Sequence, residues 1–378
     1  MKKVIIFPGK YIQGEGVLRE AGRYIGIVGR RPVLLWGKRA REAVKATLIE
    51  SLGSAGLEFV DVPFNGECTK AEARRVADAA LSAKADAIVG IGGGKVMDTA
   101  KGAAALTSLR TVMIPTIASN DAPTSACTVW HNDAGKCVGF DLWKFNPDIV
   151  LVDTGVVAKA PVRFFVAGMG DALATWPEAN AAGQSQAVSC AGGVPTMTVM
   201  ALARLCFDTL MQFGVEARDA VEKGVVTPAV EKVVEANVLL SGVGWESGGL
   251  ACAHAIANAL PAFSETHHCL HGEKVAFGLM SQMCLDKGMK KDTMLPIVDF
   301  MAAVGLPITF AELGLHGFSP ARLRDFARIV ASKGSFVHNH NFEVTAASVA
   351  DAMVAADALG NRRKRKSSDG TRGEKCSD

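Results

Sequence analysis

The sequence predicts an α/β domain over residues 1–160 followed by an all-helical domain over residues 161–360. Strand and helix patterns alternate as far as about Thr154, and such alternation is typical of a mostly parallel sheet covered on both faces. Helical patterns then continue with almost no strand candidates. A chain of 378 residues is long enough for two domains of ordinary size.

Five short apolar runs are the expected strands of the first domain, at residues 33–36, 57–62, 87–91, 111–115 and 148–152. Helices are expected between them at residues 40–53, 70–83 and 96–106. The first of these carries Val44, Leu48 and Leu52 on one side, as an amphipathic helix does. Thr69 is expected to cap the second, because its hydroxyl can accept from a free backbone amide.

The second domain shows helical patterns at residues 196–213, 228–241 and 345–359, among others. After these, residues 361–378 are charged and lack apolar partners. The basic run from Arg362 to Lys366 belongs to this segment. We therefore expect a solvated, disordered tail there.

Composition excludes several classes of protein. Hydrophobic residues make up 49% of the chain, which excludes global disorder, and the net charge of +3 gives no case for nucleic acid or an acidic membrane surface. No apolar run reaches transmembrane length without interruption. We expect no signal peptide at the start of the chain, and the nine cysteines form no CxxC pair. We expect a cytoplasmic protein with free thiols.

A glycine cluster, Gly90–Lys95, follows the expected strand at residues 87–91 and opens the next helix. Glycines at such a position let the backbone approach a pyrophosphate, and the helix N-terminus offers free amides. The cluster departs from the GxGxxG pattern, so a standard Rossmann unit is not indicated. It favours a dinucleotide site, the alternative being a tight strand–helix turn.

The segment Pro115–Ser125 follows the next strand and is rich in hydroxyls. If the two strands are adjacent, both loops lie on one sheet edge and line one pocket. Thr116, Ser119 and Ser125 would then bond cofactor atoms, and Asp121 would face substrate hydroxyls. The alternative is a turn of the Asx type.

Histidines gather between Gly248 and Met280. With Asp171, His254 and His271 are interpreted as three ligands of one catalytic metal, a number that leaves a position open. The two histidines lie 17 residues apart, which is about 25 Å on one straight helix. We therefore expect two helices that bend at Pro261, the second capped by Ser264 or Thr266.

Spacing alone leaves two alternatives open. His267 and His271 are one helical turn apart and could bind an ion by themselves. The histidines could also be ordinary core or surface residues of a helical hairpin.

Six motifs in order resemble the glycerol dehydrogenases, zinc-dependent members of the iron-type (group III) alcohol dehydrogenase superfamily, whose fold is dehydroquinate synthase-like. They are Gly9–Gly14, GIGGGK at 90–95, PTIASNDAP at 115–123, GMGDALATW at 168–176, SGVGWESGGLACAHAIANAL at 241–260 and HHCLHGEKVAFG at 267–278. The resemblance runs from about Pro8 to Gly360. It implies a nucleotide-binding α/β domain, a helical metal-binding domain and, usually, an octamer.

The resemblance also implies site residues. The zinc ligands fall on Asp171, His254 and His271, and the substrate-contacting aspartate falls on Asp121. The residues expected at the cofactor, NAD or NADP, are Gly37, Lys38, Gly92, Gly93, Gly94, Lys95, Asp98, Thr116, Ser119, Ser125, Cys127 and His131. His267 and His268 are candidates for proton relay or for contacts behind the ligands, and helix capping is the alternative.

Three departures from the family pattern matter. Thr175 stands where iron-binding relatives place a further histidine, so three protein ligands remain, which suits zinc and a chelating 1,2-diol. Gly37 stands where an aspartate commonly binds the ribose of NAD, with Lys38 and Arg39 beside it, which favours NADP. Cys127 and His131 replace the usual leucine and tyrosine at the cofactor loop.

The resemblance implies oxidation of glycerol or a related 1,2-diol to a hydroxyketone, with hydride transfer to the nicotinamide. Rival hypotheses are a dehydroquinate synthase-like lyase, a dehydrogenase of glycerol phosphate or another polyol, and a protein that acts in assembly or on nucleic acid through the basic tail.

Overall fold

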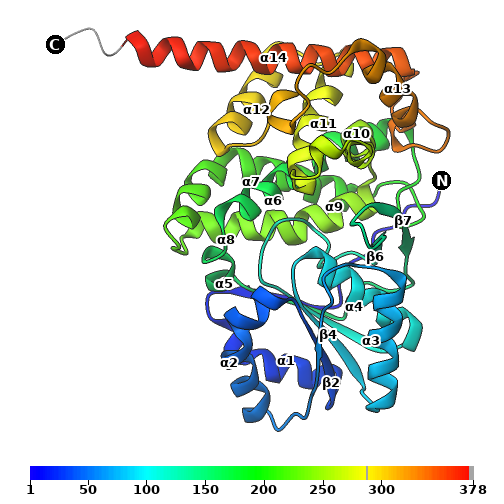
Figure 1. The fold of residues 1–378 in the computed structure, drawn as a ribbon, viewed down its shortest axis with the longest axis vertical. Coiled ribbons are helices and arrows are strands. Elements are labelled where there is room, and N and C mark those ends of the chain that lie inside the picture. The colour runs from blue at the N-terminus through cyan, green and yellow to red at the C-terminus, as the bar shows by residue number, and fades with distance from the viewer. Residues whose placement is uncertain (287, 374–378) are drawn as a thin grey trace.

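The computed structural model describes residues 1–286 and 288–373. Figure 1 shows an α/β half, in blue and cyan, below a stack of helices that runs from green to red. The last element with a place in the sheet is β8, and the purely helical part begins at Val162.

All six strands of the main sheet are parallel, in the order β1-β8-β5-β4-β2-β3. The strands are β1 (Tyr11–Gly14), β2 (Pro32–Trp36), β3 (Val60–Pro63), β4 (Ala87–Gly92), β5 (Arg110–Pro115) and β8 (Ile149–Asp153). Every residue of β2, β4 and β8 is buried, which explains why these strands are continuous apolar runs in the sequence.

Helices cover both faces of this sheet. They are η1 (Val17–Glu20), α1 (Ala21–Val28), α2 (Lys38–Ser54), α3 (Lys70–Ser82) and α4 (Gly94–Thr107). Leu34 and Trp36 share a core cluster with Ile25 of α1, whereas Val33 and Leu35 share one with α3 and α4. Thr69 caps α3 by accepting from the amide of Glu72, as expected.

The carboxyl ends of β2, β4 and β5 meet at one edge. Gly37 donates its N–H to Ile91 (3.0 Å), and Thr116 donates to Gly92 at the same distance. The chain runs outward from β2 to β3 and returns through β4 on the other side of β2. The glycine turn after β4 therefore lies where the strand order reverses, a favoured ligand position in open α/β sheets.

An antiparallel ribbon of β6 (Cys127–His131) and β7 (Cys137–Leu142) was not predicted. Trp130 anchors it by packing with Cys68 and Ala73 beside α3. Nearly every residue of β7 is exposed. The strand therefore lacks the burial pattern by which strands are found in a sequence.

The helical half contains no sheet strand within the described residues. The short helix α5 (Thr154–Ala158) precedes this half. The α-helices of the half are α6 (Val162–Ser185), α7 (Met197–Glu222), α8 (Pro228–Glu235), α9 (Ser241–Gly248), α10 (Cys252–Ala259), α11 (His271–Leu285), α12 (Lys291–Val304), α13 (Pro320–Val330) and α14 (Ala346–Gly373). Short helical turns are η3 (Leu260–Ala262), η4 (Ser264–Thr266), η5 (Ala311–Leu313) and η6 (Phe336–His338), and η2 (Ala236–Leu240) is a π-helix.

The expectation of a disordered tail over residues 361–378 differs from the structure, in which α14 continues to Gly373 (Figure 1). Arg363 forms an ion pair with Asp299, and Lys364 forms one with Glu312. These pairs attach the first part of the basic run to the helical half. The remainder of the expected tail, residues 374–378, lies outside the described residues.

By length and composition, α7 is apolar enough to cross a membrane. Its buried residues nevertheless recur every three or four positions, and they include Val199, Cys206 and Leu210. This period gives one buried face, and α7 packs with α6 and α8. The pattern is that of a core helix.

Close packing of α11 on α6 depends on a glycine. A Cβ on Gly272 would lie 1.8 Å from the carbonyl oxygen of Ala167 and 2.9 Å from the amide nitrogen of Asp171. Neither backbone atom can move without shifting α6.

We expect Gly272→Ala to destabilise the protein by about 1–3 kcal/mol, because the added methyl overpacks two helix backbones. Gly53→Ala is the control, since nothing lies within 4 Å of its Cβ position in α2. It should stabilise by up to about 1 kcal/mol. Midpoints of urea unfolding measure both, and equal midpoints for Gly272→Ala and the parent would contradict the packing argument.

Candidate metal centre and cofactor cleft

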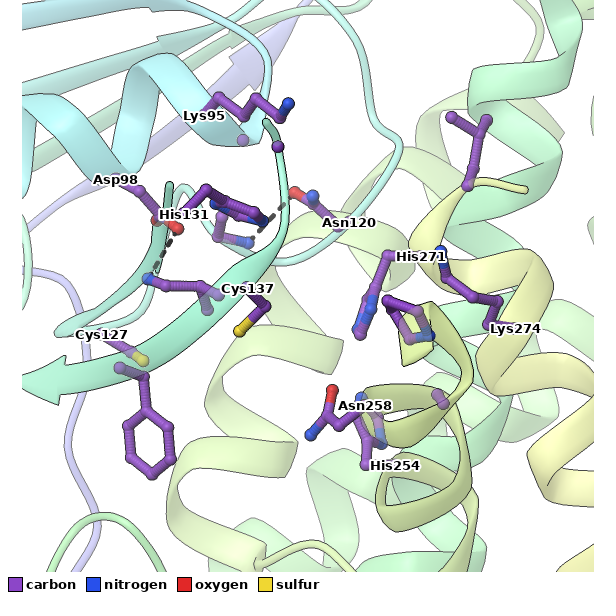
Figure 2. A pocket seen from close by; sticks show the side chains of 18 of the residues that line it. Lys95, Asp98, Asn120, Cys127, His131, Cys137, His254, Asn258, His271 and Lys274 are labelled. Carbon is purple, nitrogen blue, oxygen red and sulfur yellow. Dashed lines mark hydrogen bonds between the residues drawn. The ribbon is translucent and has the colours of Figure 1, made fainter. Parts of the chain in front are cut away.

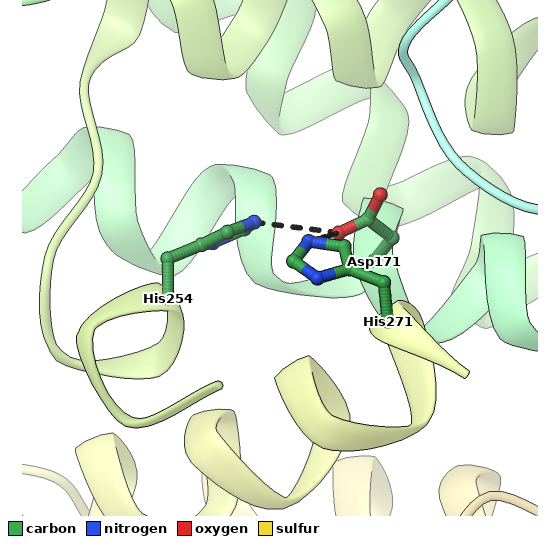
Figure 3. Close-up of side chains that lie close together, drawn as sticks. All are labelled: Asp171, His254 and His271. Carbon is green, nitrogen blue, oxygen red and sulfur yellow. Dashed lines mark ion pairs between the residues drawn. The ribbon is translucent and has the colours of Figure 1, made fainter. Parts of the chain in front are cut away.

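Three helices bring Asp171, His254 and His271 together (Figure 3). Asp171 projects from α6, His254 from α10 and His271 from the first turn of α11. The Nε2 atoms of His254 and His271 lie 3.3 and 3.4 Å from Oδ1 of Asp171. The three candidate ligand atoms all lie within 4.8 Å of one another, which is the spacing that one shared ion requires.

A bend brings the two histidines together, as the sequence predicts. α10 ends at Ala259, and the chain turns through η3, which contains Pro261, before α11 begins. The expected capping by Ser264 or Thr266 is wrong. Both fall in η4, and the Thr266 hydroxyl bonds the Leu260 carbonyl (2.8 Å).

The cap of α11 is Leu270 instead. Its amide donates to Oε2 of Glu273 at 2.7 Å. This places His271 at the first helical position, where its side chain faces α6.

Asp171 is 1% exposed, and neither of its carboxylate oxygens has a hydrogen-bond partner. Burial acts to raise the pKa of this carboxyl, but His271 and His254 outweigh it and lower the pKa. A buried carboxylate without partners calls for a cation beside it. The residues therefore fit a metal ion held by two imidazoles and one carboxylate.

Desolvation lowers the pKa of His271 to about 4, so its imidazole keeps a lone pair for a metal at neutral pH. His254 differs, because Glu178 and Asp171 overcome the effect of burial and raise its pKa. Metal binding at this position would displace a proton.

Sequence reasoning missed Glu178. This fully buried carboxylate accepts from Nδ1 of His254, and also from the backbone amides of His254 (2.9 Å) and Ala251 (2.8 Å). It thereby orients the imidazole so that Nε2 faces Asp171. The available signal was its spacing, since Glu178 follows Asp171 by two helical turns on the same face of α6.

A cavity of about 810 Å³ opens between the two halves, in front of the metal-ligand candidates. Figure 2 shows Lys95 and Asp98 on the α/β side and His254, Asn258 and His271 on the helical side. Asp171 lies behind the two imidazoles rather than in the cavity wall. The cavity joins the metal centre to the glycine turn, so a cofactor and a substrate could meet within it.

The structure separates the expected cofactor residues into two groups. Those that line the cavity are Gly94, Lys95, Asp98, Ser125, Cys127 and His131. Those that lie outside its wall are Gly37, Lys38, Gly92, Gly93, Thr116 and Ser119. Most of the second group follow β2, β4 and β5, so they share the sheet edge with the glycine turn.

Charged partners hold two of the lining residues. Lys95 donates to Glu67 (2.5 Å), which also lies 3.6 Å from Nδ1 of His131. Asp98 pairs with buried Lys101 (2.9 Å) and accepts from the amide of Val129 (3.0 Å). Asp98 therefore also anchors β6.

Asp121 lines the cavity at the junction of the two halves. Its Oδ2 accepts from the hydroxyl of Ser241 at 2.7 Å. Burial, followed by repulsion from Asp171, raises the pKa of Asp121 to about 8. The expected Asx-type bond is also present, from the amide of Ala122 to Asn120 (3.3 Å).

The other two histidines of this segment, His267 and His268, make backbone contacts. His267 lines the cavity, with Nε2 3.0 Å from the carbonyl of Pro261, and Nδ1 of His268 lies 2.8 Å from that of Glu265. Because Nε2 of His271 faces Asp171, the geometry favours the site shared with Asp171 over an ion held by His267 and His271 alone.

Comparison with known proteins finds relatives of nearly the whole chain. Residues 8–154 match the model of the iron-containing alcohol dehydrogenase family. A glycerol dehydrogenase of Pseudomonas putida is 44% identical, over 95% of this chain and 98% of its own. A glycolaldehyde reductase of Halobacterium salinarum is 40% identical, over 96% and 99%.

The crystal structure of glycerol dehydrogenase from Schizosaccharomyces pombe superposes with a TM-score of 0.93 and 32% identity, covering 97% of this chain and 93% of that one. Sequence, fold and the metal-ligand candidates thus agree, and the chain belongs to the glycerol dehydrogenases of the iron-containing alcohol dehydrogenase family.

Proposed function

We propose that this protein oxidises glycerol, or a closely related 1,2-diol, to a hydroxyketone and transfers the hydride to a nicotinamide cofactor. The observation that carries the proposal is a cavity that His254 and His271 line from one half and Gly94 of the glycine turn lines from the other. Relatives more than 40% identical over nearly the whole chain are glycerol dehydrogenases.

We propose zinc as the metal, held by Asp171, His254 and His271. Two imidazoles and one carboxylate form a three-ligand set typical of catalytic zinc, with room for substrate oxygen. Bound there, the ion would act as a Lewis acid that lowers the pKa of a substrate hydroxyl.

The chain's own residues would position the reactants. The N-terminus of α4 and the ammonium of Lys95 would bind the cofactor pyrophosphate. Asp121 would accept from the substrate hydroxyl that does not react. The cavity between the halves would hold the carbon that loses hydride against the nicotinamide.

We also propose a cytoplasmic homo-oligomer, an octamer by family resemblance.

The lyase alternative requires cations for a phosphate in the helical half. Among the described residues of that half, Lys274 alone of the lysines and arginines lines the cavity. Its ammonium already donates to the Cys269 carbonyl (3.0 Å), which does not favour the lyase.

Purified, zinc-loaded protein should form reduced cofactor with glycerol and with 1,2-propanediol, and EDTA should abolish the reaction. Absorbance of the reduced nicotinamide measures both effects. Zinc-loaded protein that turns over neither diol would contradict the proposal and favour a lyase or a dehydrogenase of phosphorylated substrates.

His254→Ala and His271→Ala should each lower zinc affinity at least about tenfold, because each leaves two ligands. Zinc content after dialysis against a chelator measures retention. His316→Ala is the matched control, since this histidine is exposed on a loop of the helical half. Full zinc content in either ligand variant would show that the assignment is wrong.

We propose that the enzyme accepts NADP. Gly37 precedes α2, whose first turn carries exposed Lys38 and Arg39 and no acidic residue. A helix N-terminus with two cations attracts a 2′-phosphate, whereas a carboxylate would repel it.

The variant Gly37→Asp should therefore lower kcat/KM for NADP by about tenfold relative to NAD. The closest atom to a Cβ at this position is Val96 Cγ2 at 3.4 Å, so the side chain fits. Arg39→Ala should lower kcat/KM for NADP and leave kcat/KM for NAD unchanged. A parent enzyme with a strong preference for NAD would refute the assignment.

A further inference from the structure

Thr175 occupies the helical turn that follows Asp171 on α6. It is 2% exposed, and its hydroxyl donates to Oγ of Ser241 at 3.2 Å. Its methyl group faces α9, where a Cβ on Gly244 would lie 2.3 Å from it. The side chain is thus enclosed, and its hydroxyl is directed at Ser241.

Ser241 continues this chain of hydroxyls. It is fully buried, and its Oγ donates to Oδ2 of Asp121 at 2.7 Å. A serine hydroxyl has one hydrogen. Because Ser241 accepts from Thr175, that hydrogen is directed at Asp121.

The surrounding backbone fixes Ser241 between the two partners. Ser241 directly follows the π-helix η2, a local structure that is frequent at functional sites. On its other side, a Cβ on Gly242 would lie 1.8 Å from the hydroxyl oxygen of Thr124. Thr124 in turn donates to the Val238 carbonyl at 2.9 Å, so the loop that carries Asp121 is bonded to the same helix.

We propose that Thr175 and Ser241 are positioning residues that make the enzyme selective for vicinal diols. The hydroxyl chain holds Oδ2 of Asp121 toward the protein and leaves Oδ1 for a substrate hydroxyl in the cavity. The inference rests on the proposed function, because it assigns Asp121 to the second hydroxyl of the diol.

The consequence is a difference between substrates. A diol uses both the metal and Asp121, whereas a monoalcohol uses the metal alone. Loss of the hydroxyl chain would therefore weaken reaction with the diol and leave reaction with the monoalcohol nearly unchanged.

The test compares kcat/KM for 1,2-propanediol with kcat/KM for 2-propanol, which lacks the second hydroxyl. Ser241→Ala should lower the ratio about tenfold, because the hydrogen bond that holds Oδ2 of Asp121 is lost. Thr175→Val should lower it by a smaller factor, since Ser241 can still reach Asp121. Thr175→Ser keeps the hydroxyl, so its ratio should equal that of the parent enzyme.

A double-mutant cycle isolates the chain. Thr175→Val should have no further effect on the ratio in the Ser241→Ala background. Thr154→Val is the matched control, because this buried hydroxyl donates to the carboxylate of Glu231 (2.6 Å) away from the cavity wall. Its ratio should equal that of the parent.

Zinc affinity, measured by competition with a chelator, should be the same in all variants. An unchanged ratio in Ser241→Ala, additive effects in the cycle, or lost zinc affinity would each overturn the positioning role while the parent still oxidises the diol. A zinc-loaded parent that oxidises no diol would overturn the proposed function as well.

Discussion

The buried carboxylate of Asp171 is the constraint on which the site depends. Both its oxygens are withdrawn from water without a hydrogen-bond partner, which is costly unless positive charge lies beside them. α6, α10 and α11 converge at this point. Glycines permit the convergence, since a Cβ on Gly170 would lie 2.4 Å from the Gly272 carbonyl oxygen. The helical half thus brings cation ligands to a place where a cation is needed.

One segment, Pro115–Ser125, joins this centre to the sheet. Thr116 bonds the glycine turn, and the carbonyl of Ala118 accepts from the side chain of Asn237 in η2 (3.2 Å). Lys101 of α4 donates to the Ala122 carbonyl (2.8 Å). Hydride transfer requires that two reactants be held at a fixed separation. Because the same loop is bonded to both halves, it holds the glycine turn at a fixed distance from the candidate metal centre.

The fold was predictable where burial and period are simple. Strands with two buried faces are apolar runs in the sequence, and the capping hydroxyl of Thr69 predicts the start of α3. The β6–β7 ribbon was not predictable, because Val138 and Phe140 are exposed apolar residues on an edge without a buried face. The helix through residues 361–373 was missed because Arg363 finds its partner, Asp299, far away in the sequence.

Only part of the site was predictable from the sequence, because it too depends on contacts between residues far apart in the chain. Spacing left the histidines open to several interpretations, and family resemblance selected Asp171, His254 and His271. Glu178 and Ser241 were missed, because their partners are far away in the sequence. Glu178 bonds His254, 76 residues away, and Ser241 bonds Asp121, 120 residues away. A sequence displays ligand types, but the groups that orient them depend on packing between distant helices.

Thr175 links the number of metal ligands to substrate recognition in the proposed function. The sequence shows a position where a fourth ligand is missing. In the structure, Gly244 brings α9 against that position and leaves space for a short side chain. The hydroxyl that fits there bonds Ser241, which bonds Asp121. In the proposed function, the residue that leaves a metal position open for a second substrate oxygen would therefore also orient Asp121 toward the diol.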